Sequence, residues 1–273
     1  MKHKDPELLL NTAICAAINA GQKILEIYNS NDFKIEYKED DSPLTIADKA
    51  AHEIINNKLS LTDIPILSEE GSHQPYIERK NWEYLWVVDP LDGTKEFIKQ
   101  NDEFTVNIAL IHNQKTVLGV IYCPVFKTLY FNYLNGGSYL VKDIGFDYGC
   151  NKALKEVSEK KQKIPQDISR NYRVVASRSH LSEETKTFIE KLKTGQPELE
   201  TVSIGSSLKL CLLAEGKADI YPRFAPTMEW DTAAGHAIVK AAGGNVINND
   251  TNKEVTYNKE NLLNPWFIAK SKK

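Results

Sequence analysis

The sequence has few cysteines, and they follow no pattern that would staple a small fold or bind zinc. Among its 273 residues there are four cysteines, at positions 15, 123, 150 and 211, and there is no CxxC pair. Closely spaced cysteines and histidines are the usual zinc ligands, so no zinc site is expected. We expect reduced, mostly buried thiols, as is typical of a cytosolic protein.

The sequence also lacks a long uninterrupted apolar run. No stretch of about 18 residues is apolar throughout, and the charged residues 1–5 are not followed by a secretory segment. We therefore expect no transmembrane segment and a cytoplasmic location. Peripheral attachment at the inner face of the cell membrane is left open.

An excess of charge of one sign is absent as well. The formal net charge of -3 creates no general field for nucleic acid or anionic lipid, so an anionic ligand must be held by a local cluster. The Lys-rich residues 155–163 have no interleaved aromatic side chains, which argues against nucleic-acid binding. The expected partner is a small molecule, and the chain itself is expected to be a monomer or a homodimer.

The order of the predicted elements divides the chain into two halves. In the first half, helices over residues 6–27 and 45–59 accompany short apolar strands and an antiparallel meander over residues 105–141. In the second half, strands and helices alternate over residues 173–269, which favours a smaller α/β unit. The polar residues 151–168 are the predicted boundary. We expect an α/β (α+β) fold with an antiparallel sheet in the first half. The predicted domains are residues 1–160 and 161–273.

One segment, residues 86–97, carries the strongest chemical signal. A hydrophobic strand delivers Asp89 and Asp92 into a turn. Pro90 fixes φ in this turn, and Gly93 permits a tight reversal of the chain. Two carboxylates held so close repel each other unless a cation lies between them. Because Mg²⁺ prefers oxygen ligands and suits phosphate chemistry, the segment predicts a magnesium site.

The residues after this turn open a short helix, predicted over residues 94–99. Its free N–H groups would receive a phosphate beside the ions. The alternative is that Asp-Gly-Thr is an exposed turn with a helix cap, as most such tripeptides are. The buried strand in front of the turn, with Asp89 three residues before Asp92, favours the site.

Two further acidic positions could complete the cluster. Glu69 follows another apolar run, where the end of a strand would meet the same crevice. Asp231 begins an Ala-rich helix predicted over residues 231–242. Each has a simpler interpretation, namely a solvated loop for Glu69 and an ordinary helix N-cap, worth about 1 kcal/mol, for Asp231. Taken singly the simpler interpretation is favoured, and only the combination points to a metal site.

In combination and in order, four segments resemble the motifs of the inositol monophosphatase superfamily, whose members are lithium-sensitive, Mg²⁺-dependent phosphomonoesterases. These segments are residues 41–48 (DSPLTIAD), 68–70 (SEE), 89–94 (DPLDGT) and 230–234 (WDTAA). They span most of the chain. The resemblance implies an αβαβα layered sandwich with the catalytic ions between its two halves.

The resemblance also implies two or three Mg²⁺ ions and direct in-line hydrolysis without a phosphoenzyme. Asp48 and Thr94 match the pair that activates the attacking water, and Glu69 is a further catalytic candidate. Most of the metal site would lie in the first domain, and its last ligand in the second. The implied metal ligands are Glu69, Asp89, Leu91 through its carbonyl oxygen, Asp92 and Asp231.

Several details resemble one branch of the superfamily, the 3'(2'),5'-bisphosphate nucleotidases of the bacterial CysQ type. The continuation Lys95–Phe97 is typical of this branch, residues 177–180 resemble its adenosine-contacting segment, and residues 205–209 resemble its segment at the non-scissile phosphate. The implied reaction converts 3'-phosphoadenosine 5'-phosphate (PAP) to AMP and phosphate, in sulfur assimilation or nucleotide recycling. The implied substrate contacts are Glu69, Asp92, Gly93, Thr94, Ser177, His180, Gly205, Ser206, Lys209, Arg223 and Asp231.

A bisphosphate substrate needs cations away from the metals, and two residues are candidates for this role. Lys209 and Arg223 could form charge-assisted hydrogen bonds to a second phosphate, whereas inositol phosphatases tend to carry a glutamate in place of Arg223. The alternatives are a solvent-exposed Lys209, a structural salt bridge for Arg223, and a capping or surface role for His180. Two departures from the branch are Ala225, where glycine is common, and Glu229, which could perturb the metal site or face solvent.

Other functions fit the same motifs. The protein could be an inositol monophosphatase or a broad sugar-phosphate phosphatase of the same superfamily. In a different class, it could be a non-catalytic nucleotide or metal sensor, although every expected metal ligand and Thr94 are present. The choice among PAP, its sulfated relative PAPS and inositol phosphates is not fixed by the sequence.

Overall fold

A computed structural model describes the protein over most of its length. The described residues are 5–30, 33–37, 43–133, 136–144, 150–177, 182–196 and 198–272. The main helices are α1 (Pro6–Ser30), α2 (Ile46–Leu59), α5 (Cys150–Lys160), α6 (Glu183–Gly195), α7 (Leu208–Ala214) and α8 (Glu229–Ala241). Shorter elements are β1 (Glu36–Tyr37), β2 (Pro43–Leu44), the 3-10 turn η1 (Ser60–Thr62), α3 (Tyr76–Arg79) and α4 (Thr94–Ile98).

The larger sheet is formed by the first part of the chain. Its strands follow the order β3-β4-β5-β6-β7-β8-β9. Strands β3 and β4 are parallel, and every later pair is antiparallel, which confirms the predicted meander. The bounds are β3 (Ile66–Ser68), β4 (Tyr84–Asp92), β5 (Thr105–His112), β6 (Lys115–Cys123), β7 (Thr128–Tyr133), β8 (Gly137–Val141) and β9 (Gln162–Ile164).

The smaller sheet is formed by the second part of the chain. Its order is β11-β10-β12-β14-β13, with β10 parallel to both of its neighbours and β14 antiparallel to both of its own. The bounds are β10 (Arg173–Ser177), β11 (Glu200–Ile204), β12 (Ile220–Arg223), β13 (Asn245–Asn248) and β14 (Phe267–Lys270).

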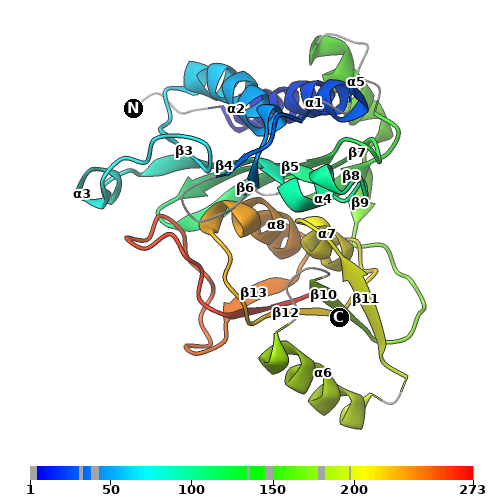
Figure 1. Ribbon diagram of the computed structural model, residues 1–273. Helices are drawn as coiled ribbons and strands as arrows, with labels where there is room; N and C mark the ends of the chain where they lie inside the picture. The colour runs from blue at the N-terminus through cyan, green and yellow to red at the C-terminus, as the bar shows by residue number, and fades with distance from the viewer. Residues whose placement is uncertain are drawn as a thin grey trace.

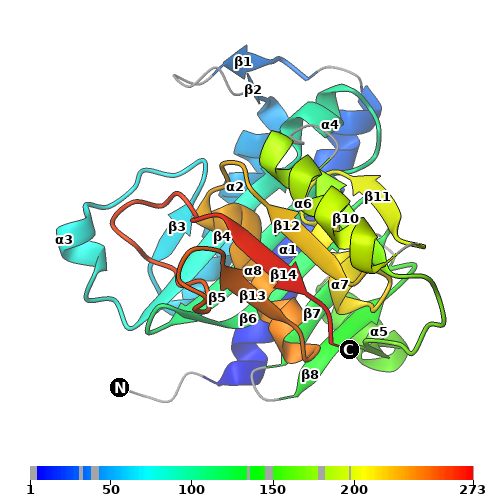
Figure 2. The ribbon, with the colours of Figure 1, turned by 90° about the horizontal axis from the view of Figure 1, so that it is seen from below.

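Helices and sheets alternate in layers, as Figure 1 shows. Helices α1, α2 and α5 lie on one face of the larger sheet, and α7 and α8 lie between the two sheets. Helix α6 covers the outer face of the smaller sheet, which is seen from below in Figure 2. Apolar clusters fill the space between successive layers of the described structure. This is the expected αβαβα sandwich.

The segment predicted to separate the two halves is itself structured. Residues 150–160 form α5, and β9 then adds to the edge of the larger sheet, paired with β8. The chain reaches the smaller sheet only at β10, after residues 165–172. The division at residues 160 and 161 therefore falls between α5 and β9, and the assignment of two domains stays a prediction.

The expectation of reduced cysteines throughout is wrong for one pair. Cys15 in α1 and Cys150 at the start of α5 form a disulfide, with their Cα atoms 5.5 Å apart. Cys123 and Cys211 are buried free thiols. Because 135 residues separate the paired cysteines, only the tertiary packing of α5 on α1 could reveal the bond.

Helix α1 bears on the membrane expectation. Judged by length and composition alone, its 25 residues are long and apolar enough to cross a bilayer, although polar residues such as Asn11 and Asn19 interrupt its apolar run. In the structure, however, 61% of its most apolar window is buried, and Ala13, Ala17 and Ile24 pack in the core against the larger sheet. Such burial is what a core helix of a globular protein shows.

Candidate active site

The carboxylates of the site lie where two parallel strands end. Strand β3 ends at Ser68, so Glu69 follows it directly, and its N–H donates to the carbonyl oxygen of Val88 in β4 (3.1 Å). Asp89 and Asp92 lie in the last part of β4, where the pairing with β5 shifts register between them. This irregularity brings both aspartates toward one edge of the sheet.

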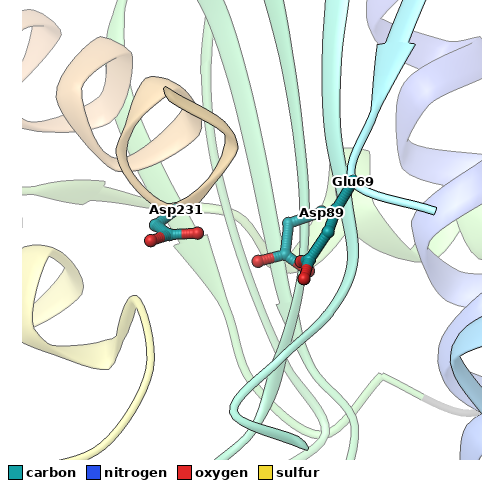
Figure 3. Close-up of side chains that lie close together, drawn as sticks. All are labelled: Glu69, Asp89 and Asp231. Carbon is teal, nitrogen blue, oxygen red and sulfur yellow. The ribbon is translucent and has the colours of Figure 1, made fainter. Parts of the chain in front are cut away.

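A third element supplies Asp231. Glu69, Asp89 and Asp231 each offer an oxygen atom, and these atoms lie within 4.8 Å of one another. Figure 3 shows Glu69 and Asp89 side by side, with Asp231 opposite them on α8. Asp231 is the third residue of α8 rather than its N-cap, and its Oδ2 accepts the N–H of Met228 (2.9 Å). The predicted cluster thus forms between the two halves of the molecule.

Burial makes this cluster electrostatically strained without a counter-ion. Desolvation raises the pKa of Asp89 well above its usual value, and the nearby Glu69 carboxylate adds to the effect. Desolvation likewise raises the pKa of Asp231 to about 8. Closely packed oxygen donors with repelling charges are what a hard divalent cation requires, so the donor set fits Mg²⁺.

Asp92 is held by Asn107, which no sequence motif includes, and by Ser207, which lies in the segment 205–209 that was expected at the non-scissile phosphate. Its Oδ2 accepts hydrogen bonds from Asn107 Nδ2 (3.2 Å) and from Ser207 Oγ (2.8 Å). Asn107 lies in β5, and Ser207 precedes α7. Nothing in the local sequence marks Asn107 as a site residue, because its role depends on the pairing of β4 with β5.

Asp48 and Thr94 form the predicted pair. Thr94 Oγ1 donates to Asp48 Oδ1 (3.1 Å) and lies 3.3 Å from the carbonyl oxygen of Leu91. Asp48 Oδ2 accepts from the N–H and the hydroxyl of Thr45, the N-cap of α2 (2.7 and 2.6 Å). Burial raises the pKa of Asp48 to about 6 despite these hydrogen bonds. The carboxylate is thereby fixed in place, with one oxygen accepting the Thr94 hydroxyl.

Gly93 makes the reversal between Asp92 and Thr94 possible. Its φ is +98°, which L side chains rarely adopt, and an added Cβ would lie 2.9 Å from the carbonyl oxygen of Glu103. The predicted tight turn is therefore present. It leads directly into α4, so that Thr94 is the first residue of this helix.

A cavity of about 260 Å³ joins these groups to a basic region. Asp48 lies behind Thr94 and does not line the cavity, whereas His180 lies outside the described residues. The predicted residues that line it are Glu69, Asp89, Leu91, Asp92, Gly93, Thr94, Ser177, Gly205, Ser206, Lys209, Arg223 and Asp231.

The basic region consists of Lys209 and Arg223. Lys209 is only 8% exposed, so the solvent-exposed alternative is wrong, and burial lowers its pKa to about 8. Arg223 is equally buried and donates to the carbonyl oxygen of Pro226 (2.8 Å). Within the described part of the chain it has no ion pair with a carboxylate, which contradicts the structural salt bridge.

Two other residues behave differently from expectation. The N–H of Gly205 donates to Glu103 Oε2 (2.7 Å), so this amide is already used within the protein. Glu229 neither faces solvent nor approaches the carboxylate cluster as a ligand. It is fully buried and accepts hydrogen bonds from Asn258 N and Lys259 Nζ. The departure from the usual motif is thus a structural ion pair between Glu229, at the start of α8, and Lys259.

Comparison with known proteins places the chain in a family. A model of the inositol monophosphatase family matches residues 5–271. The chain belongs to this family. Members of the inositol monophosphatase family are metal-dependent, and the cluster of Glu69, Asp89 and Asp231 is a possible metal-binding site.

Individual relatives narrow the comparison. This chain is 47% identical over 255 residues to the 3'(2'),5'-bisphosphate nucleotidase CysQ of Salmonella typhimurium. The match covers 92% of this chain and 95% of the relative. Its sequence is 53% identical to that of CysQ from Bacteroides thetaiotaomicron. The crystal structure of that protein matches this one with a TM-score of 0.87 and 96% of each chain covered. The suhB protein of Bartonella henselae, at 24% identity and a TM-score of 0.73, covers 96% of this chain and 93% of its own, and shares the fold.

Proposed function

We propose that this protein is a Mg²⁺-dependent 3'(2'),5'-bisphosphate nucleotidase that hydrolyses the 3'-phosphate of PAP to AMP and phosphate. The observation that carries the proposal is that one cavity is lined both by carboxylates, Glu69, Asp89 and Asp231, and by two buried cations, Lys209 and Arg223. A substrate with two phosphates has a partner for each. The similarity to the CysQ nucleotidases supports the same substrate.

The basic region has the donors that a second phosphate needs. Arg223 Nε and Ser206 Oγ are buried and have no hydrogen-bond partner within the described residues. Such groups are costly to bury unless a ligand satisfies them. Lys209 Nζ bonds the carbonyl oxygens of Ser206 (2.5 Å) and Ile204 (3.4 Å), which directs its charge into the same region. We therefore assign the 5'-phosphate to this region.

The acidic region would hold two or three Mg²⁺ ions. Glu69, Asp89 and the carbonyl oxygen of Leu91 would bind one ion. Asp89, Asp92 and Asp231 would bind another, with Asp89 shared. Bound Mg²⁺ supplies a water of lowered pKa and neutralises charge on the leaving oxygen.

The protein's own part in the reaction is to orient a nucleophile and accept its proton. The hydroxyl of Thr94 points to Asp48 and can pass on a proton from an attacking water. Asp48 is held by Thr45 and cannot swing away. Glu69 would assist in activating the attacking water. No serine or cysteine nucleophile is required, so we propose direct hydrolysis.

Phosphate release from PAP and from inositol 1-phosphate, measured side by side, tests the proposal. We expect PAP to be hydrolysed far better, and we expect Thr94→Ala to lose turnover while its circular dichroism spectrum stays that of the wild type. Preference for inositol 1-phosphate would instead support the inositol monophosphatase or sugar-phosphate phosphatase alternative. Nucleotide binding without turnover in the wild type would indicate a sensor.

The setting of this activity remains part of the proposal. We propose a cytoplasmic enzyme of sulfur assimilation or nucleotide recycling, sensitive to lithium and acting as a monomer or homodimer. This proposal also allows attachment at the inner face of the cell membrane and hydrolysis of PAPS. Size-exclusion chromatography with light scattering and a lithium titration of PAP hydrolysis address these points directly.

A further inference from the structure

Ser207 occupies a helix-capping position but does not cap the helix. It is the N-cap of α7, yet its side chain makes no hydrogen bond to the N–H groups of that helix. Serine at this position ordinarily accepts one of them. Instead, Ser207 Oγ lies 2.8 Å from Asp92 Oδ2 and 2.8 Å from the carbonyl oxygen of Asp231. Ser207 is 3% exposed. Its hydroxyl is therefore directed to Asp92 and to the backbone of Asp231 rather than to the N–H groups of α7.

Asn107 completes this contact from the opposite half of the molecule. Its Nδ2 donates to Asp92 Oδ2 (3.2 Å) and to Ser207 Oγ (2.9 Å), and its Oδ1 accepts the hydroxyl of Thr105 (3.0 Å). An ionised carboxylate only accepts hydrogen bonds, so the NH₂ group must face Asp92. Thr105 then fixes the carbonyl side of the amide. Thr105, Asn107 and Ser207 are all buried.

The network has a definite consequence for Asp92. Asn107 Nδ2 and the Ser207 hydroxyl both approach one carboxylate oxygen, Oδ2, and the single hydrogen of Ser207 is shared between this oxygen and the carbonyl oxygen of Asp231. The other oxygen, Oδ1, receives no hydrogen bond from the described part of the protein. The side chain is thus held in one orientation with one oxygen left for a ligand. Ser207 also spans the distance between Asp92, at the end of β4, and the backbone of Asp231 in α8. These two aspartates come from different halves of the chain.

We propose that Asn107 and Ser207 are positioning residues that fix Asp92 relative to Asp231, and so set the spacing of carboxylates that a divalent cation needs. The inference rests on the proposed function in one respect, the role of Asp92 and Asp231 as cation ligands. It assigns no contact with the substrate to either residue. Hydrogen bonds that orient metal ligands contribute strongly to metal affinity, and their loss typically weakens binding about 10- to 100-fold.

The variants Ser207→Ala and Asn107→Ala test the proposal. Each removes donors to Asp92 and leaves every carboxylate in place. The matched controls are Ser138→Ala and Asn132→Ala. Among the described residues, the Ser138 side chain bonds only the carbonyl oxygen of Ile238 (2.6 Å), and the Asn132 side chain bonds only backbone groups. Both control residues are buried, so any general cost of deleting a buried polar side chain is common to the two pairs.

The measurements are Mg²⁺ binding to the full chain by isothermal titration calorimetry and the thermal unfolding midpoint without Mg²⁺. We expect Ser207→Ala and Asn107→Ala to weaken Mg²⁺ binding about 10- to 100-fold, and both control variants to bind Mg²⁺ as the wild type does. Equal Mg²⁺ affinity in all five proteins would overturn the proposal, whatever their unfolding midpoints.

A parallel PAP assay separates this proposal from the proposed function. If the wild type binds Mg²⁺ and Ser207→Ala weakens the binding, but PAP is not hydrolysed, the positioning role stands and the substrate assignment fails. If PAP is hydrolysed while Ser207→Ala and Asn107→Ala bind Mg²⁺ normally, the positioning role alone fails.

Discussion

At the residue scale, capping and site chemistry share the same carboxylates. Asp48 and Asp231 each occupy the third position of a helix and accept the N–H of the N-cap residue. In Asp48 this uses Oδ2 and leaves Oδ1 for Thr94. The interpretation of Asp231 as the helix N-cap is wrong, because Met228 is the N-cap of α8 and Asp231 accepts its N–H from the third position. A helix start is a rigid place from which to present a carboxylate.

Arg223 offers a prediction at this scale. Replacing it by glutamate, as in Arg223→Glu, puts a negative charge where the second phosphate is expected. We expect KM for PAP to rise about 10- to 100-fold, in keeping with the loss of about 1.5–3 kcal/mol from hydrogen bonds to a charged group. Hydrolysis of a monophosphate such as inositol 1-phosphate should change much less. Equal losses for both substrates would show that Arg223 does not bind the second phosphate.

At the element scale, the position of α8 depends on how closely β6 lets it approach. Gly119 in β6 faces this helix, and an added Cβ would lie 2.3 Å from the carbonyl oxygen of Ala234. Ala234 is one turn after Asp231, so the same contact sets the depth of the carboxylate. The absence of a side chain at Gly119 thus places a ligand that lies more than a hundred residues further along the chain.

The variant Gly119→Ala tests this packing. We expect it to lower the free energy of unfolding by about 1–3 kcal/mol, because a methyl group cannot enter without moving α8. The control is Gly195→Ala at the end of α6, where an added Cβ meets nothing within 4 Å. Urea denaturation measures the free energy of unfolding of both variants. A Gly119→Ala variant as stable as Gly195→Ala would contradict the close contact.

At the scale of the whole molecule, charges from separate halves meet in a buried place. Glu69 and Asp89 belong to the larger-sheet half, and Asp231 to the other. Desolvation raises the pKa of Asp89 and Asp231, and repulsion between neighbouring carboxylates adds to the effect. Without a cation, folding therefore has to work against these carboxylates at neutral pH, and a bound cation relieves the cost.

Metal removal and pH should therefore act together on stability. A carboxyl group whose pKa is raised on folding binds more protons in the folded state, so stability falls as pH rises from about 4 toward the folded values, about 6 for Asp48 and about 8 for Asp231. We expect EDTA-treated protein to unfold at a lower temperature than Mg²⁺-loaded protein, by a larger margin at pH 8 than at pH 6. Differential scanning calorimetry at both pH values decides it, and a margin independent of pH would count against cation binding at these carboxylates.

The sequence by itself determined the elements and the chemical character of the site. Helical spacing predicted α1 and α2, alternation and turns predicted the meander, and the carboxylates after two apolar strands predicted a cation site, because each of these signals is local. The tertiary structure alone decided which groups hold Asp92. It also decided that buried Glu229 forms an ion pair with Lys259 and that Cys15 forms a disulfide with Cys150. These contacts join residues far apart in the chain, and their partners are chosen by the packing of layers rather than by any neighbouring residue.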